Sequence, residues 1–230
     1  MKRAFVFLDL DNTILDFSAA ERNALRRALG EMGFSPDNEQ LARYSVINIA
    51  QWEKLEDGLI SREETLVSRF EIWFRELGLS LSGAEANHRY EGYLHEGHWF
   101  MPGAEALLER LHGEYGLYLA SNGVASVQAS RIASAGIARY FDGIFISEEL
   151  GANKPDPAFF EACFARIPDF RLERALMVGD SLSSDIRGGK NAGMKTCWFN
   201  PGQKEARPEL RADYEVRSLE ELPGLLERIF

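Results

Sequence analysis

The stretch AFVFLDLDNT, residues 4–13, places two aspartates directly after a short apolar run. Residues 4–8 are apolar throughout, which is typical of a strand buried on both faces of a parallel sheet. Asp9 and Asp11 are two positions apart, so in an extended chain both carboxylates point the same way. Burying unpaired carboxylates is costly unless a cation neutralises them, and magnesium prefers such oxygen ligands. The pattern favours a magnesium site, with a simple turn cap as the alternative.

Four later apolar runs resemble the first and are expected to be strands: residues 117–120, 143–146, 175–178 and 195–199. Stretches of helical character accompany them: residues 104–111, 124–135, 157–166 and 184–192. Strands that alternate with helices predict right-handed βαβ units and a doubly wound α/β fold with a parallel sheet. In such sheets ligands bind beyond the carboxyl ends of the strands. The functional residues are therefore expected at those ends.

A long helical block interrupts this alternation after the first strand. Residues 16–100 contain no comparable strand and read as four amphipathic helices: residues 19–32, 37–55, 61–77 and 84–94. Ser61 and Glu64 have the spacing of a capping box at the start of the third helix. We expect an α/β core formed by residues 1–15 and 101–230, with residues 16–100 as an inserted helical cap that could cover the site.

The other strand ends also carry polar residues. Ser121-Asn122-Gly123 follows the second run, and a hydroxyl beside backbone N–H groups at a helix start can bind an anion, although the same triplet is a common turn. Lys154 follows the third run, and Pro155 helps to hold it in a rigid loop. These positions predict a positively charged, hydrogen-bonding surface for an anionic group.

The fourth run ends at Gly179-Asp180, and Asp185 follows about one helical turn later. Gly179 permits a close backbone approach, whereas a helix cap is the alternative reading of the segment that follows. Four successive strands thus deliver Asp-x-Asp, Ser, Lys and Asp to the same edge of the sheet. That combination predicts one site with a metal, a lysine and a hydroxyl.

Composition narrows the classes of function. The chain has 230 residues, of which 45% are hydrophobic and 27% charged, as in ordinary globular proteins. Its net charge of −10 argues against nucleic acid or an anionic membrane as a partner. No apolar run is long enough for a membrane span, and the first apolar run is too short for a signal peptide. We expect a cytoplasmic protein with reduced Cys163 and Cys197.

The strand-end residues resemble the four motifs of the haloacid dehalogenase-like hydrolase superfamily. These are Asp9-Leu-Asp11-Asn-Thr13, Ser121, Lys154, and Gly179-Asp180-Ser181 with Asp185. The helical insert lies where that superfamily carries its first type of cap. Two further stretches are similar to YjjG-type pyrimidine 5′-nucleotidases. The first runs from Trp52 to Trp73 and contains Asp57-Gly58-Leu59-Ile60-Ser61 and Arg69-Phe70-Glu71-Ile72-Trp73. The second runs from Asp185 to Trp198.

The resemblance implies a magnesium-dependent phosphohydrolase and gives each residue a role. Asp9 is expected to attack phosphorus and form an aspartyl-phosphate, while Asp11 protonates the leaving oxygen and later activates water. Ser121 and Lys154 are expected to bind the phosphoryl oxygens. The other implied contacts are phosphate-binding backbone N–H groups of Asn122 and Gly123, and magnesium binding by Asp9, Asp180, the Asp11 backbone carbonyl and, through water, Asp185.

The substrate implied is a small phosphate monoester, in particular a pyrimidine nucleoside 5′-monophosphate, hydrolysed by a monomer or homodimer. The candidate substrate contacts are Phe17, Asn48, Trp52 and Arg69. Asn48 and Trp52 share a helix face and could pair with and stack on a base. The alternatives are a surface Asn48, a Trp52 in the core of the cap, and a surface Arg69.

Four other activities remain open from the sequence. A phosphatase for phosphoglycolate or sugar phosphates would use the same core. A haloacid dehalogenase shares the aspartate nucleophile but needs neither magnesium nor Asp11. A phosphosugar mutase would require a bisphosphate activator. A phosphoacceptor signalling module would be shorter and would lack the helical block.

Overall fold

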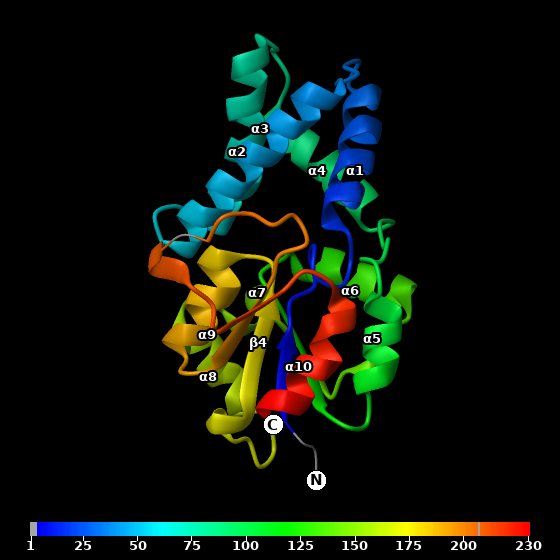
Figure 1. Ribbon diagram of the computed structural model, residues 1–230. Coiled ribbons are helices and arrows are strands. Elements are labelled where there is room, and N and C mark those ends of the chain that lie inside the picture. Colours follow the sequence, from blue (N-terminus) through cyan, green and yellow to red (C-terminus); the bar gives the residue numbers. More distant parts are fainter. Residues whose placement is uncertain (1–3, 207) are drawn as a thin grey trace. The chain divides into compact units, whose positions relative to one another are not determined.

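The computed structural model describes residues 4–206 and 208–230, and these form two compact units (Figure 1). The first unit combines the chain up to Phe17 with His98–Phe230, and the second unit is Ser18–Gly97. Residues 1–3 of the expected core lie outside the described residues.

The first unit is built on a six-stranded parallel sheet. Its strands are β1 (Phe5–Leu8), β2 (Gly116–Ser121), β3 (Gly143–Ile146), β4 (Ala175–Gly179), β5 (Lys195–Phe199) and β6 (Tyr214–Val216). Their order is β3-β2-β1-β4-β5-β6. In the register, Val6 of β1 lies opposite Leu117 of β2 and Leu176 of β4. The expected doubly wound α/β fold is confirmed, and it places the carboxyl ends of β1, β2 and β4 side by side.

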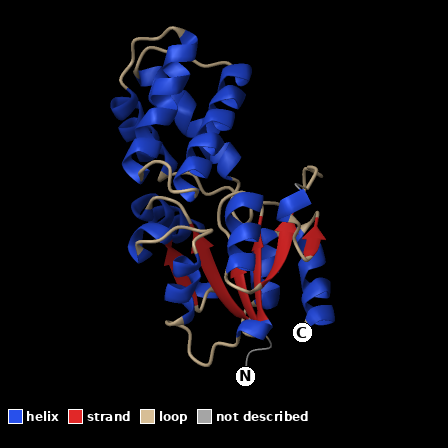
Figure 2. Cartoon of the chain, turned by 90° about the vertical axis from the view of Figure 1, so that its left-hand side faces the viewer, coloured by secondary structure: helices blue, strands red, loops and turns tan. Residues whose placement is uncertain are grey.

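Helices pack on both faces of this sheet (Figure 2). They are α5 (Ala104–Leu111), α6 (Ala125–Ala135), α7 (Ser147–Leu150), α8 (Pro157–Phe164), α9 (Arg187–Asn191) and α10 (Leu222–Ile229). Val6 and Leu8 belong to one apolar cluster and Phe7 to another. Because successive side chains of a strand point to opposite faces, a run that is apolar throughout fills both clusters at once.

Several elements differ from the sequence-based expectation. The helix expected at residues 184–192 is instead a π-helical turn, Leu182–Ile186, followed by α9. Ser181 caps this turn by accepting a hydrogen bond from the Ser184 N–H at 3.2 Å. The edge strand β6 and helix α10 were not predicted. β6 has three residues with an exposed Glu215 between half-buried Tyr214 and buried Val216, so it lacks a continuous apolar run.

The second unit contains nearly all of α1 (Phe17–Glu31), together with α2 (Asn38–Glu56), α3 (Arg62–Leu77) and α4 (Gly83–Leu94). Its core is aromatic: Tyr44 and Phe70 pack with ring centroids 4.9 Å apart. A reciprocal capping box joins Asp37 and Gln40 before α2, and Ser61 accepts a hydrogen bond from the Glu64 N–H at 3.1 Å before α3. Among the helices of the described residues, none is long and apolar enough to span a membrane.

Candidate active site

Asp9 lies immediately beyond β1 and is held from both its backbone and its side chain. Its N–H donates to the Val178 carbonyl oxygen at 3.0 Å, and its Oδ1 accepts from Lys154 Nζ at 2.8 Å. The residue is only 7% exposed. The predicted neighbourhood of Asp9 and Lys154, which are far apart in the sequence, is therefore present as a buried ion pair.

Lys154 connects the ends of three strands. Besides Asp9, its ammonium group donates to Asp185 Oδ1 at 2.6 Å and to the Ala120 carbonyl oxygen at 2.6 Å. An ammonium group has three N–H donors, and these three acceptors match them. Burial opposes the charge of Lys154, but the attraction of Asp185 and Asp9 outweighs it and raises the pKa of Lys154.

Asn122 has a role that the sequence did not indicate. We expected only its backbone N–H to matter, but its side chain clamps the peptide of Lys154. Asn122 Nδ2 donates to the Lys154 carbonyl oxygen at 2.8 Å, and the Lys154 N–H donates to Asn122 Oδ1 at 2.9 Å. These two bonds fix the loop after β3 to the loop after β2, and so orient the lysine.

Asp9, Asp180 and Asp185 bring carboxylate oxygens within 4.8 Å of one another. The Asp185 Oδ2 also accepts a hydrogen bond from the Ser181 N–H at 3.0 Å. Gly179 makes this position possible, because a Cβ added there would lie 2.1 Å from Asp185 Oδ2. Three of the four predicted metal-binding aspartates therefore form one cluster.

The charge of this cluster fits a divalent cation. Asp9, Asp180 and Asp185 carry three negative charges against the single positive charge of Lys154, so two remain to be neutralised. Burial raises the pKa of Asp9 despite the opposing attraction of Lys154, and burial, reinforced by Asp185, raises that of Asp180 to about 7. A cation among these carboxylates would favour their charged forms and so offset the effect of burial. Oxygen-only ligands of this kind suit magnesium.

Asp11 makes its contacts with α6 rather than with Lys154. Its Oδ2 accepts from Gln128 Nε2 at 2.7 Å, and its Oδ1 pairs with Arg131 Nη1. Neither α6 residue was predicted from the sequence. Their only signal was a polar pair spaced i, i+3 in a helix whose other inward residues, such as Val127 and Ile132, are apolar. Nothing in the sequence indicated their partner.

Two predicted substrate residues of the second unit are buried within it. Asn48 is 4% and Arg69 is 2% exposed, so a surface location is wrong for both. Arg69 Nη1 donates to Asn48 Oδ1 at 2.9 Å, and Asn48 Nδ2 donates to Glu21 Oε1 at 2.8 Å. Arg69 also donates to Asn87 Oδ1 at 2.6 Å. The polar groups of Asn48 and Arg69 thus serve a buried network.

The other two candidate substrate residues have aromatic contacts with arginines. Trp52 is half-buried, and the Arg62 guanidinium lies 5.6 Å from its ring centroid. Phe17 belongs to the first unit, and the Arg131 guanidinium lies 5.5 Å from its ring centroid. Phe17 therefore packs beside the residue that holds Asp11.

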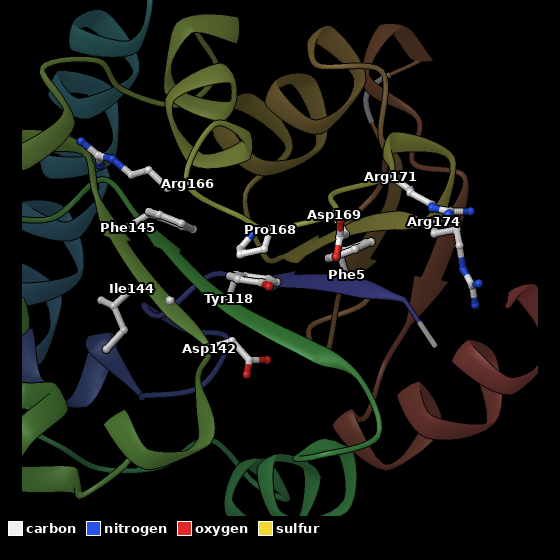
Figure 3. A pocket seen from close by; sticks show the side chains of 11 residues that line it. Phe5, Tyr118, Asp142, Ile144, Phe145, Arg166, Pro168, Asp169, Arg171 and Arg174 are labelled. Carbon is white, nitrogen blue, oxygen red and sulfur yellow. The ribbon is translucent and has the colours of Figure 1, made fainter. Parts of the chain in front are cut away.

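A separate cavity of about 540 Å³ lies on the first unit (Figure 3). Its lining includes Phe5 at the start of β1, Gly143 at the start of β3, and Tyr118. It is therefore near the amino-terminal edge of the sheet, opposite the carboxyl ends that carry the acidic cluster. None of the described residues identified in its lining belongs to the predicted site.

Comparison with known proteins agrees with this geometry. A family model described as haloacid dehalogenase-like hydrolase matches residues 4–193. The chain belongs to this hydrolase family. The hydrolase is 39% identical to the pyrimidine 5′-nucleotidase PynA of Streptococcus pneumoniae, covering 97% of this chain and 95% of PynA. It is 31% identical to the pyrimidine 5′-nucleotidase YjjG of Escherichia coli, covering 98% and 99%.

The fold comparison leads to the same family. The orthorhombic crystal structure of YfnB from Bacillus subtilis, described as bound to magnesium and as revealing interdomain movement, matches the hydrolase with a TM-score of 0.93. The two sequences are 39% identical, and the match covers 98% of this chain and 99% of the YfnB chain. The expected family resemblance is thereby confirmed over essentially the whole chain.

Proposed function

We propose that this hydrolase is a magnesium-dependent phosphatase of nucleoside 5′-monophosphates that prefers pyrimidine bases. The observation that carries the reaction is the buried cluster in which Lys154 lies between Asp9 and Asp185, with Asp180 close by. Similarity to PynA over nearly the full length of both chains supports the choice of substrate. The substrate is then a small phosphate monoester.

In the first step, a carboxylate oxygen of Asp9 attacks phosphorus, forming an aspartyl-phosphate as the bond to the 5′-oxygen breaks. Lys154 Nζ, at 2.8 Å from Asp9 Oδ1, attracts the transferring phosphoryl group to this carboxylate. The Ser121 hydroxyl binds another phosphoryl oxygen. Asp11 donates its proton to the departing 5′-oxygen, so that the nucleoside leaves as a neutral alcohol.

In the second step, Asp11, now a carboxylate, accepts a proton from water as the water oxygen attacks phosphorus of the aspartyl-phosphate. The bond to Asp9 breaks, and inorganic phosphate leaves. Asp9, Asp180 and the Asp11 backbone carbonyl are the groups that would hold magnesium, and Asp185 would act through a bound water. When bound, magnesium supplies positive charge that offsets the repulsion between the anionic nucleophile and the anionic ester.

For the leaving group, we propose that residues 16–100 act as a cap and that Trp52 contacts the base. A half-buried tryptophan keeps part of its ring available for stacking, whereas Asn48 and Arg69 are buried and hydrogen-bonded within the second unit. We therefore favour Trp52 over those two residues as a substrate contact. Phe17 remains a candidate wall of the site.

The test is a substrate panel measured with magnesium. It compares UMP, dUMP and dTMP with AMP, GMP, phosphoglycolate and sugar phosphates. We expect kcat/KM to be highest for the pyrimidine nucleotides and Trp52→Ala to lower it for them more than for small phosphates. Preference for phosphoglycolate or a sugar phosphate, with pyrimidine nucleotides inert, would contradict the proposal.

Two controls belong to this panel. Asp9→Asn removes the nucleophile while keeping the side-chain shape, so turnover of every substrate should be lost in a folded protein. A chelator should abolish activity and added magnesium should restore it. Chelator-insensitive turnover of a haloacid would instead indicate a dehalogenase, and a kinetic lag relieved by a sugar bisphosphate would indicate a mutase.

A further inference from the structure

Gln128 of α6 bridges two residues from different strand ends. Its Nε2 lies 2.7 Å from Asp11 Oδ2 and 2.8 Å from Ser121 Oγ. A side-chain amide has two N–H donors on one nitrogen, so a single group can serve both acceptors. Gln128 therefore ties the end of β1 to the end of β2 through one amide.

The orientation of this amide follows from its surroundings. Its Oε1 accepts a hydrogen bond from Arg131 Nη1 at 2.9 Å, and the same guanidinium pairs with Asp11 Oδ1. A flipped amide would place its oxygen against the Asp11 carboxylate and its NH₂ group against the guanidinium, so both contacts would become repulsive. Arg131 thus fixes Gln128 as a donor to Asp11 and Ser121.

This arrangement also determines what the Ser121 hydroxyl can do. Ser121 Oγ accepts from Gln128 Nε2 and, at 3.2 Å, from the Gly123 N–H. A hydroxyl has two acceptor sites and one hydrogen, so with both acceptor sites used its remaining capacity is as a donor. Gln128 and Gly123 together direct the Ser121 hydrogen toward an acceptor such as a phosphoryl oxygen.

Packing holds the bridge in place. Gln128 is 1% exposed and Arg131 is fully buried. Gly123 makes room for the glutamine, because a Cβ added there would lie 2.3 Å from Gln128 Nε2. A buried guanidinium requires hydrogen-bond acceptors, and oxygens of Asp11 and Gln128 provide them. Removing one member therefore disturbs the orientation of the others.

We propose that Gln128 and Arg131 are positioning residues that aim the Asp11 carboxyl group at the leaving oxygen and the Ser121 hydroxyl at the phosphoryl group. This inference rests on the phosphatase activity proposed for this site. Gln128 couples the two tasks: proton delivery and phosphoryl binding depend on one amide. Arg131 acts through Gln128 and Asp11, and neither residue need touch the substrate.

Two substrates with different leaving groups distinguish a positioning role of Gln128 from a purely structural one. UMP expels an alkoxide that needs a proton, whereas p-nitrophenyl phosphate expels a stable phenolate that does not. The ratio kcat/KM reports the steps through departure of the leaving group, which include the step served by Asp11 as an acid. We expect Gln128→Ala to lower kcat/KM for UMP roughly 10- to 100-fold more than for p-nitrophenyl phosphate.

Three variants complete the experiment. Ser121→Ala should lower kcat/KM for both substrates by the same factor, because phosphoryl binding is common to them. The Gln128→Ala/Ser121→Ala double variant tests whether the two residues act together in phosphoryl binding. Its loss of kcat/KM for p-nitrophenyl phosphate should be smaller than the product of the losses in the two single variants. Arg131→Lys keeps the positive charge but loses the planar guanidinium. It should therefore lower kcat/KM for UMP, relative to that for p-nitrophenyl phosphate, by a smaller factor than Gln128→Ala does. Ser126→Ala, at an exposed position of α6, is the matched control and should match wild type.

Equal losses for UMP and p-nitrophenyl phosphate in Gln128→Ala would overturn the positioning role of Gln128, as would unchanged kinetics. A urea titration of each variant separates such losses from a smaller folded fraction. The proposed function fails in a different way: wild type would then hydrolyse p-nitrophenyl phosphate but none of the nucleotides. In that case the leaving-group comparison is repeated with the alkyl phosphate that the panel identifies.

Discussion

Gly179 lies where a side chain would collide with Asp185 of the acidic cluster. The absent Cβ of Gly179 leaves room for the Asp185 carboxylate, which accepts from the Ser181 N–H on one side and from Lys154 on the other. A side chain at position 179 would occupy the space of three Asp185 atoms, Oδ2, Cγ and Cβ, at 2.1, 2.3 and 2.8 Å. Asp185 would have to move, and its two partners would lose their acceptor.

We therefore predict that Gly179→Ala weakens magnesium binding by roughly 10- to 100-fold, the range typical when a group that orients metal ligands is displaced. Isothermal titration with magnesium, together with the magnesium dependence of turnover, measures this. Gly202→Ala is the matched control, because a Cβ added there would lie 3.9 Å from its nearest neighbours, two carbon atoms of the Lys204 side chain. Equal magnesium affinity for Gly179→Ala and wild type would show that Asp185 does not influence the metal.

At the residue level, sequence patterns predicted the charged members of the site but not the polar side chains that orient them. Asp9, Lys154 and Asp185 could be placed together because each follows an apolar run. Gln128 could not, because its two partners come from other strands and depend on tertiary packing. Asn122 was identified through its backbone, whereas the structure shows its amide clamping Lys154.

At the scale of elements, a buried polar network joins α1, α2 and α3. Glu21 of α1 binds Asn48 of α2, which in turn binds Arg69 of α3. Burial raises the pKa of Glu21, although Ser45, Asn48 and Arg69 favour its charged form. The hydrogen bonds from Ser45 and Asn48 are the main groups that favour the charged carboxylate, and Arg69, which is bonded to Asn48, adds to them.

We predict that Arg69→Ala lowers the free energy of unfolding by about 1–3 kcal/mol, because it leaves the amide oxygens of Asn48 and Asn87 without their donor. Urea unfolding followed by tryptophan fluorescence measures the change. Arg75→Ala, an exposed arginine on the same helix α3, should change stability by less than about 0.5 kcal/mol. A stable Arg69→Ala protein with a raised KM for nucleotides would instead favour a substrate contact.

Elements with strong periodicity were predictable and those without it were not. The five buried strands and the four helices α1 to α4 each carry a recognisable apolar pattern. The π-helical turn at Leu182–Ile186 was missed because its backbone follows the Ser181 cap and the packing of Asp185 against Gly179, neither of which alters the apolar pattern. β6 was missed because an edge strand of three residues is stabilised mainly by pairing with β5.

Two buried cysteines, one on each face of the sheet, make the stability of the first unit depend on pH. Cys163 and Cys197 are free and fully buried in the two apolar clusters on opposite faces of the sheet. Burial raises the pKa of each thiol to about 12. Such thiols stay protonated in the folded protein at pH values where an unfolded chain would ionise them.

The stability of the protein depends on pH because the folded and unfolded chains bind different numbers of protons. Between the ordinary thiol pKa of about 8.5 and the folded value of about 12, the folded protein binds more protons than the unfolded chain, so stability falls as pH rises. We predict a loss of up to about 1.4 kcal/mol per pH unit for each thiol. Urea unfolding at pH 8 and pH 10.5 measures it.

Other groups also titrate in this range, so the comparison is with the Cys163→Ala/Cys197→Ala double variant. That variant should lose less stability over the same pH interval, even though its stability at pH 8 is lower because of the missing sulfur atoms. Identical slopes for the two proteins, or rapid reaction of native wild type with a thiol reagent at pH 8, would contradict the buried, high-pKa state of the thiols.

The chain leaves and re-enters the first unit through two segments that are hydrogen-bonded to each other. The Asp16 N–H donates to the Trp99 carbonyl oxygen at 2.7 Å, and the Met101 N–H donates to the Ile14 carbonyl oxygen at 2.9 Å. An insertion whose two ends already meet adds little loop-closure entropy, whatever its length. Residues 18–97 can therefore be exchanged for a helical module of another length while the two hydrogen-bonded ends, and with them the sheet and its aspartates, keep their places.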